Sequence, residues 1–238
     1  MIPKQTIRVC AVLLALAVTS SSMALGGTIV GKVTYEGRTP PQRPMRMDAD
    51  PKCAEKHSGT VLDQTFMIGD GGAFANVFLV ITGGLEGKSF DAPSQPVVMD
   101  QNGCIYTPRV MGIQVGQQFK VLNSDGLLHN VHSLSKDNPP FNRAMPASVT
   151  EADYSFDKTE RFRIKCDVHP WMTSWVTVVD HPFYAVSGAD GSFRIENVPA
   201  GTYTIEARHE FERFRIYSET VEVGDSGEAT VNFVFKPE

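Results

Sequence analysis

Residues 166–172 read CDVHPWM and place a thiol, an imidazole and a thioether within seven positions. Taken singly, Cys166 could be a core cysteine, His169 an exposed loop histidine and Met172 a core methionine. Together they form a C-x2-H-x2-M pattern, and thiolate, imidazole and thioether are the side chains that bind soft or borderline transition metals. The pattern therefore predicts a metal site on one short loop.

A further nitrogen ligand is available upstream, in NSDGLLHNVHS at 123–133. This stretch contains His129 and His132, and alternation along a strand sends positions three apart to opposite faces. One strand would thus offer only one of the two histidines to a shared ion. Two imidazoles, one thiolate and a weak thioether make up the ligand set of a type 1 copper site.

The combination of HNVH at 129–132 with CDVHPWM at 166–172 resembles the cupredoxin family. The run CIYTPRVMGIQVGQQFKVLNSD at 104–125 also resembles the opening of cupredoxin domains, so the resemblance covers about 95–180. It implies one type 1 copper per chain, with the ligands His129, Cys166, His169 and Met172, and it makes His132 the second, non-ligating histidine. It also implies that His169 presents a ring edge to redox partners through an apolar patch that includes Pro170 and Trp171.

The composition of the chain favours an all-β fold. Among 238 residues, 42% are apolar, 21% are charged, and Gly (20) and Pro (15) are plentiful. Short apolar or alternating runs separated by turn signals predict dense strands. We expect them at 28–35, 74–82, 97–100, 104–106, 110–114, 118–123, 128–134, 160–166 and 174–179, with further strands after 183.

The C-terminal quarter contains a hairpin signal at Asp190-Gly191 and a second turn signal at 199–201. It resembles the carboxypeptidase regulatory-like (transthyretin-like) β-sandwich family, whose usual first strand matches IVGKV at 29–33. We therefore expect 28–94 to complete a sandwich with 183–238, and 95–180 to be an inserted copper domain. A plain string of two or three domains is the alternative. The predicted fold is thus a Greek-key cupredoxin sandwich plus a transthyretin-like sandwich.

The first 24 residues have the features of a signal peptide: a basic start, an apolar run at 9–18 and a small-x-small site ending at Ala24. We expect a periplasmic or secreted protein with no membrane span in the mature chain. In an oxidising compartment cysteines tend to pair. With Cys166 on the metal, Cys53 and Cys104 are expected to form a disulfide. The alternative is a second metal site that uses Cys53 and His57.

The functional hypothesis is an exported carrier of single electrons that meets a cytochrome or oxidoreductase by transient contact. The net charge of −5 does not favour nucleic acid. Multicopper oxidases and copper nitrite reductases need additional histidine-rich centres, and the sequence has six histidines but neither H-x-H nor H-C-H. We therefore expect no enzymatic activity. The alternatives are a structural or ligand-binding sandwich protein, or a copper storage or delivery protein.

Overall fold

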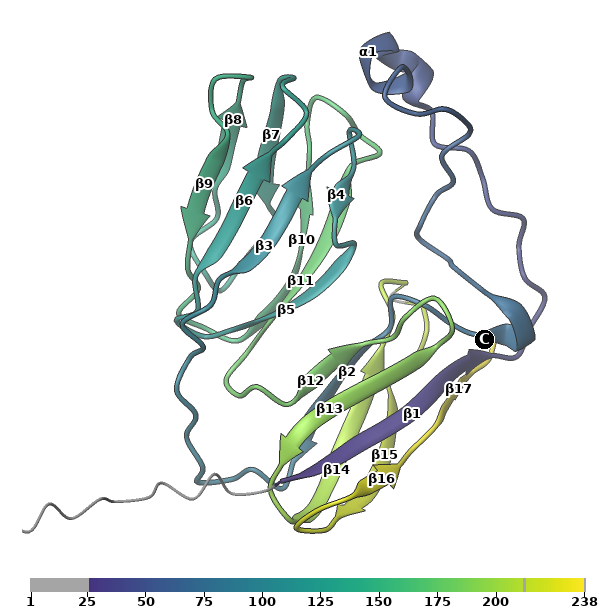
Figure 1. Cartoon of the computed structure of the whole chain (residues 1–238), viewed down its shortest axis with the longest axis vertical. Coiled ribbons are helices and arrows are strands. Elements are labelled where there is room, and N and C mark those ends of the chain that lie inside the picture. Colours follow the sequence, from purple (N-terminus) through teal and green to yellow (C-terminus); the bar gives the residue numbers. More distant parts are fainter. Residues whose placement is uncertain (1–25, 212, 238) are drawn as a thin grey trace, which may run out of the picture.

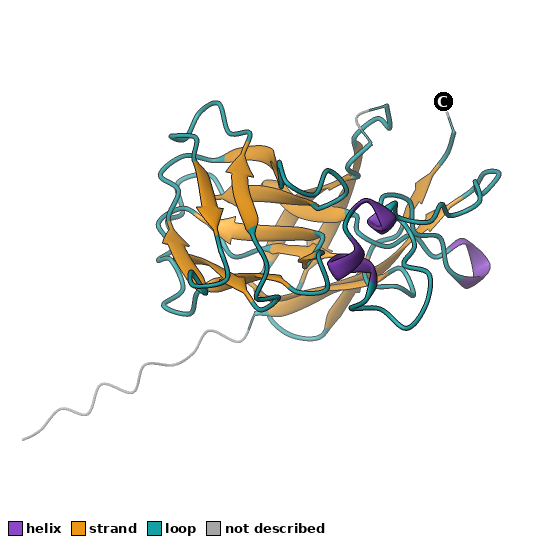
Figure 2. Ribbon diagram, turned by 90° about the horizontal axis from the view of Figure 1, so that it is seen from above, coloured by secondary structure: helices purple, strands orange, loops and turns teal. Residues whose placement is uncertain are grey.

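The computed structural model describes residues 26–211 and 213–237, so the predicted signal peptide at 1–24 lies outside the described residues. The described chain is almost entirely β (Figure 2), as the composition predicts. Its strands are β1 (Gly27–Tyr35), β2 (Phe78–Gly83), β3 (Val97–Gln101), β4 (Tyr106–Thr107), β5 (Val110–Gln114), β6 (Phe119–Asn123), β7 (His129–Ser133), β8 (Asn142–Met145), β9 (Glu151–Tyr154), β10 (Glu160–Lys165), β11 (Thr173–Val179), β12 (Tyr184–Val186), β13 (Ser192–Val198), β14 (Gly201–Arg208), β15 (Tyr217–Val223), β16 (Glu228–Thr230) and β17 (Phe233–Phe235). Among the described residues, no helix is long and apolar enough to cross a membrane.

The strands from β3 to β11 form one sandwich, drawn in teal and green in Figure 1. One sheet has the order β5-β11-β10-β7-β8 and the other the order β4-β3-β6-β9. The two pairs β5–β11 and β3–β6 are parallel, and the other neighbours are antiparallel. Alternating side chains such as Phe119 and Val121 of β6 and Phe162 and Ile164 of β10 fill the space between the sheets.

The second sandwich combines strands from both ends of the chain. Strand β1 pairs with β13 and, in its two halves, with β16 and β17, while β2 lies between β12 and β14 in the facing sheet. Its core contains Ile29 and Val33 of β1 together with Ile195 of β13 and Ile205 of β14. Residues 27–35 and 78–83 therefore lie in the same sandwich as 184–235, and β3 to β11 are inserted between them.

Strand β2 begins later than its sequence suggests. The run from 74 to 82 is mostly apolar, yet the strand starts at Phe78 because Asn76 adopts a positive φ of 61°. Such backbone geometry interrupts a strand. Strands β8 and β9 were not expected from the sequence, because each has only four residues and fully buries only one side chain.

A long excursion between β1 and β2 leaves the second sandwich and returns to it (Figure 1). It carries η1 (Met47–Ala49), α1 (Pro51–Ala54) and η2 (Asp70–Gly72). The start of α1 is well specified, since Asp50 accepts the Lys52 amide at 3.0 Å and Pro51 is the first helical residue. A disulfide from Cys53 to Cys104 attaches α1 to the first sandwich.

The two sandwiches are joined by a packed interface. Phe78 and Val80 of one meet Val110 and Val179 of the other in a small shared cluster. Beside it, the buried guanidinium of Arg109 makes a two-pronged ion pair with Glu210, at 2.7 and 3.0 Å.

Tyr184 fixes the interface at a second point by donating to the Gly112 carbonyl at 3.1 Å. A Cβ at position 112 would lie 2.2 Å from the Tyr184 ring, so only glycine allows this approach.

Candidate metal centre

His129 is the first residue of β7, and alternation along that strand decides which histidine points inward. His129 and Val131 are fully buried, whereas His132 is partly exposed on the opposite face. His132 Nδ1 lies 2.9 Å from Asp167 Oδ2, near the surface. The structure thus directs His129, and not His132, toward the interior of the sandwich.

Cys166, His169 and Met172 lie on the loop that connects β10 to β11. The loop is tightly wound, because the Cys166 amide donates to the Met172 carbonyl at 3.2 Å and the Met172 amide to the His169 carbonyl at 2.9 Å. All three side chains are buried, with exposures of 1%, 2% and 1%. The short spacing therefore brings them to one end of the core, as a compact loop requires.

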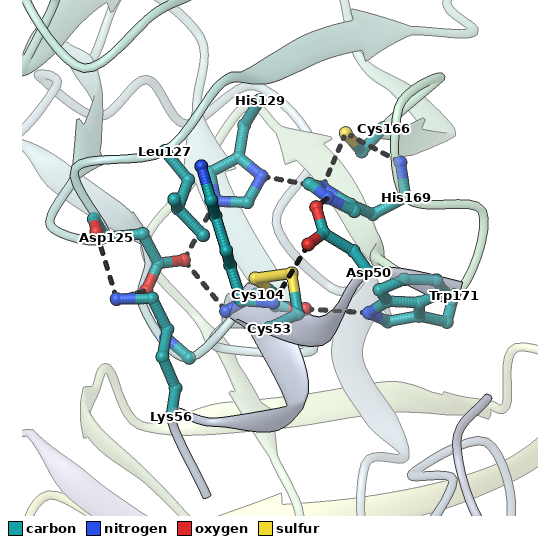
Figure 3. Close-up of a disulfide and its surroundings, with 12 residues drawn as sticks. Asp50, Cys53, Lys56, Cys104, Asp125, Leu127, His129, Cys166, His169 and Trp171 are labelled. Carbon is teal, nitrogen blue, oxygen red and sulfur yellow. Dashed lines mark hydrogen bonds and ion pairs between the residues drawn. A yellow bond between two sulfur atoms is a disulfide. The ribbon is translucent and has the colours of Figure 1, made fainter. Parts of the chain in front are cut away.

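The strand and the loop bring three ligand atoms together. His129 Nδ1 lies 2.9 Å from His169 Nδ1, and Cys166 Sγ lies 3.9 Å from His169 Nδ1. One ring nitrogen of each histidine and the Cys166 sulfur are all within 4.8 Å of one another. Figure 3 shows the two imidazoles turned toward each other and toward the sulfur. Met172 is buried in the apolar core of the first sandwich, which also contains Cys166.

Asn130 holds the loop against β7. Its side-chain oxygen accepts the Asp167 amide at 2.6 Å and the Cys166 thiol at 3.3 Å. The His169 amide in turn donates to Cys166 Sγ at 3.4 Å. Burial alone would raise the pKa of the Cys166 thiol, but hydrogen bonds from His129 and from nearby backbone amides lower it below its usual value. This environment favours the thiolate, the form of cysteine that binds metals.

A carboxylate is hydrogen-bonded to the ring nitrogen of His129 that faces away from the other candidate ligands. Asp125 Oδ2 lies 2.8 Å from His129 Nε2, so Nε2 donates and Nδ1 faces the cluster. Asp125 also accepts the Gly103 and Cys104 amides at 2.7 and 2.8 Å and pairs with Lys56 at 3.2 Å. Burial alone would raise the pKa of Asp125, but these donors lower it to about 2. The carboxylate is therefore ionised and fixes the orientation of the imidazole.

A second carboxylate contacts His169, and this one comes from outside the sandwich. Asp50, at the start of α1, lies 3.1 Å from His169 Nε2 (Figure 3). His169 is only 2% exposed. The expectation of a solvent-facing His169 ring edge is therefore wrong. It rested on the loop alone, and the covering residue stands 119 positions earlier in the chain.

The disulfide lies beside the metal-ligand cluster. The sulfurs of Cys53 and Cys104 are within 4.8 Å of a His169 ring nitrogen, and Cys104 is similarly close to Asp125 and His129. Sulfurs joined in a disulfide have no thiolate to offer an ion. The alternative site with Cys53 and His57 is not formed, since His57 Nε2 lies 2.7 Å from the Gly103 carbonyl and Cys53 is bonded to Cys104.

The donor set fits copper. A buried thiol with a lowered pKa and two imidazoles that both direct Nδ1 inward supply one soft and two nitrogen ligands. Each Nε2 atom is hydrogen-bonded to a carboxylate, as the second ring nitrogen of a metal-binding histidine usually is. The sequence named the four candidate ligands, of which the structure brings His129, Cys166 and His169 together, but it identified neither carboxylate. Asp125 had a weak signal four residues before His129, and Asp50 had none.

Comparison with known proteins gives partial likenesses only. No protein-family model and no curated protein sequence matches the chain. Among solved structures, neighbours are cupredoxins. A Cu-containing nitrite reductase from Thermus scotoductus SA-01 is 20% identical with a TM-score of 0.33, over 41% of this chain. This chain spans only 25% of that protein.

Two smaller proteins are covered almost completely. A purple cupredoxin from Nitrosopumilus maritimus is 21% identical with a TM-score of 0.30, over 35% of this chain and 99% of its own. A point mutant of amicyanin, in its reduced Cu(I) form at pH 4, is 19% identical with a TM-score of 0.33, over 42% of this chain and 98% of its own. At such scores the likenesses establish neither a family nor a function for this chain.

Proposed function

We propose that the chain is an exported type 1 copper protein that carries single electrons between redox partners. One observation carries this proposal: His129, Cys166 and His169 place two imidazole nitrogens and one sulfur within 4.8 Å of one another in a buried site. A copper ion held there would supply a Cu(I)/Cu(II) couple.

Each residue has a distinct role in that proposal. Cys166 supplies the thiolate, and the His169 amide that donates to its sulfur at 3.4 Å stabilises the negative charge. His129 and His169 supply Nδ1, and the loop and β7 hold both rings in place in advance. Met172 is the candidate weak axial ligand, since it is buried at the end of the same loop. Little movement is then needed when the oxidation state changes.

The proposed compartment is the periplasm or the exterior of the cell. The Cys53–Cys104 disulfide supports it, because structural disulfides persist in oxidising compartments and are rare in a reducing cytosol. The predicted signal peptide at 1–24 points the same way. We propose one copper per chain, because the other clusters of ligand atoms among the described residues use sulfurs of the disulfide.

Partner contact is proposed to be transient and with another redox protein. Leu128 and Val168 are large apolar side chains with exposures of 50% and 45%, and Pro170 is also exposed. Leu128 precedes His129, and the other two flank His169 in sequence. A small apolar surface next to the site suits a short-lived complex. We propose no catalytic role for the chain on its own.

The second sandwich is proposed to be a transthyretin-like brace for the copper domain. The buried Arg109–Glu210 ion pair and the shared apolar cluster at 78–80, 110 and 179 support a fixed docking of the two sandwiches. Storage or delivery of copper is less well supported. Delivery needs an exchangeable site, whereas the side chains of all four candidate ligands are at most 2% exposed.

Voltammetry of the copper-loaded protein tests the proposal. We expect a reversible one-electron wave in the wild-type protein and in His132→Ala, and its loss in His129→Ala together with loss of bound copper. His132 is a matched control because it lies on the same strand but faces away from the cluster. Copper that binds and never cycles, or that depends on His132 instead, would refute the proposed carrier.

A further inference from the structure

A pocket lies beside the candidate metal centre, between the two sandwiches and the N-terminal excursion. Its volume is about 730 Å³, and its lining comes from 43–49, 63–65, the β10–β11 region and residues 210–211. Pockets of 300–1,000 Å³ commonly hold small molecules. The walls include Trp171 and Trp175, which are the two tryptophans of the whole sequence. We call this space the tryptophan pocket.

The tryptophans give the pocket flat apolar surfaces, and each is fixed by a hydrogen bond from its Nε1 atom. Trp171 donates to the Cys104 carbonyl at 3.0 Å, and Trp175 donates to Glu210 at 3.0 Å. Both indoles remain partly exposed. The fixed, half-exposed indole of Trp171 is suited to stacking with a planar ring, whereas the Trp175 ring already has the Arg161 guanidinium 4.5 Å from its centroid.

The charges around the pocket are predominantly positive. Four arginines and two acids line it: Arg43, Arg46, Arg109, Arg163, Asp63 and Glu210. Arg109 is neutralised by Glu210 at 2.7 Å, and Arg46 pairs with Asp48 at 3.5 Å.

Arg43 and Arg163 are left without a salt bridge within 26–211 and 213–237. Arg163 is directly opposite Trp175 in the β10–β11 ladder, so guanidinium and indole lie on the same face of the sheet. The positive pocket contrasts with the net charge of −5 of the chain.

We propose that the tryptophan pocket binds a small planar aromatic anion, with its ring against Trp171 and its carboxylate or sulfonate group on Arg43 and Arg163. Guanidinium groups bind such anions through paired, charge-assisted hydrogen bonds. The Trp171 ring centroid lies 5.1 Å from that of His169. An occupant in contact with Trp171 would therefore be one side chain away from the candidate metal centre. The binding itself needs no metal.

The test uses the metal-free full chain and its own tryptophan fluorescence, which reports on this pocket because both tryptophans line it. The probe is 4-nitrobenzenesulfonate, compared with the uncharged 4-nitrobenzenesulfonamide and with ring-free methanesulfonate. We expect saturable quenching by the aromatic sulfonate and at least about tenfold weaker binding of both comparison compounds, since each lacks one of the two features recognised.

Arg43→Ala and Arg163→Ala should each weaken binding of the sulfonate about tenfold. Arg194→Ala is the matched control, because Arg194 is an exposed arginine on β13 that pairs with Glu196 and Glu228. Equal affinity for sulfonate and sulfonamide in the unaltered protein would overturn the proposal without any substitution. So would unchanged affinity in folded Arg163→Ala, as judged by its circular dichroism, or quenching that never saturates. None of these outcomes depends on copper, so a failure of this proposal would not count against the proposed electron carrier.

Discussion

Removal of the disulfide should both destabilise the protein and open the candidate metal centre. The bridge joins residues 51 positions apart. A closed loop of that length removes about 4 kcal/mol of chain entropy from the unfolded state at 25 °C, and measured bridges typically give 2–4 kcal/mol. We therefore expect Cys53→Ala/Cys104→Ala to lower the free energy of unfolding by about 3–4 kcal/mol. Replacing both cysteines together avoids leaving a new thiol beside Cys166.

Urea unfolding of the metal-free protein, followed by fluorescence and circular dichroism, measures this loss. Three polar contacts still attach α1 to its surroundings: Asp50 with His169, Lys56 with Asp125, and His57 with Gly103. They are expected to hold α1 only part of the time, so trypsin should cut after Lys56 in the variant much faster than in the wild type. A loss of less than about 1 kcal/mol together with unchanged cleavage would refute the view that the disulfide fixes α1 over the site.

Three further predictions concern single side chains. Asp50→Asn removes the negative charge at His169 Nε2, and we expect Cu(II) affinity to fall about 10–100-fold in competition with a chelator. Met172→Leu should keep copper bound and shift the reduction potential upward in voltammetry, because a thioether ligand is lost. Burial and the nearby arginines lower the pKa of His209 to about 3. Between pH 6.5 and pH 3, the His209 side chain therefore binds a proton in the unfolded chain but not in the folded chain. Stability should therefore fall by about 1.4 kcal/mol per pH unit in that range, and His209→Phe, which can still stack on Phe74, should remove this contribution.

Each of these predictions has a clear contrary result. Unchanged Cu(II) affinity in Asp50→Asn would mean that the carboxylate does not support His169. Loss of copper in Met172→Leu would make the methionine an essential ligand rather than a weak axial one. For His209, the difference in unfolding free energy between wild type and variant should change by about 3 kcal/mol from pH 7.5 to pH 4, measured with urea. A constant difference would contradict a neutral buried imidazole.

Local patterns predicted that the candidate ligands of the β10–β11 loop would lie close together. Cys166, His169 and Met172 lie within six positions of one another, and a loop between two strands brings them together without help from the rest of the fold. The sequence also predicted the strand that contains His129, because alternation along β7 places His129 and His132 on opposite faces. The strands with strong apolar runs, such as β5 and β6, were found for the same reason.

Features that depend on distant or exposed residues were not predictable. Strands β8 and β9 lie at the edges of their sheets, and each fully buries only one of its four side chains, so neither gives a strong signal in the sequence. Asp50 covers His169 because the segment between β1 and β2 carries it to the β10–β11 loop. The two residues are 119 positions apart in the chain. The cysteine count indicated a connection between the N-terminal segment and the first sandwich, but it could not show that this segment would cover His169.

The central claim is that Cys166 binds copper as a thiolate together with His129 and His169. The visible absorption spectrum of the Cu(II)-loaded protein tests it most directly, because a thiolate bound to Cu(II) gives the intense colour of blue-copper sites. We predict an intense visible band in the wild type and in Cys53→Ala/Cys104→Ala, and its complete loss in Cys166→Ser. A wild-type protein that binds Cu(II) without this band, or a band that survives in Cys166→Ser, would contradict the account.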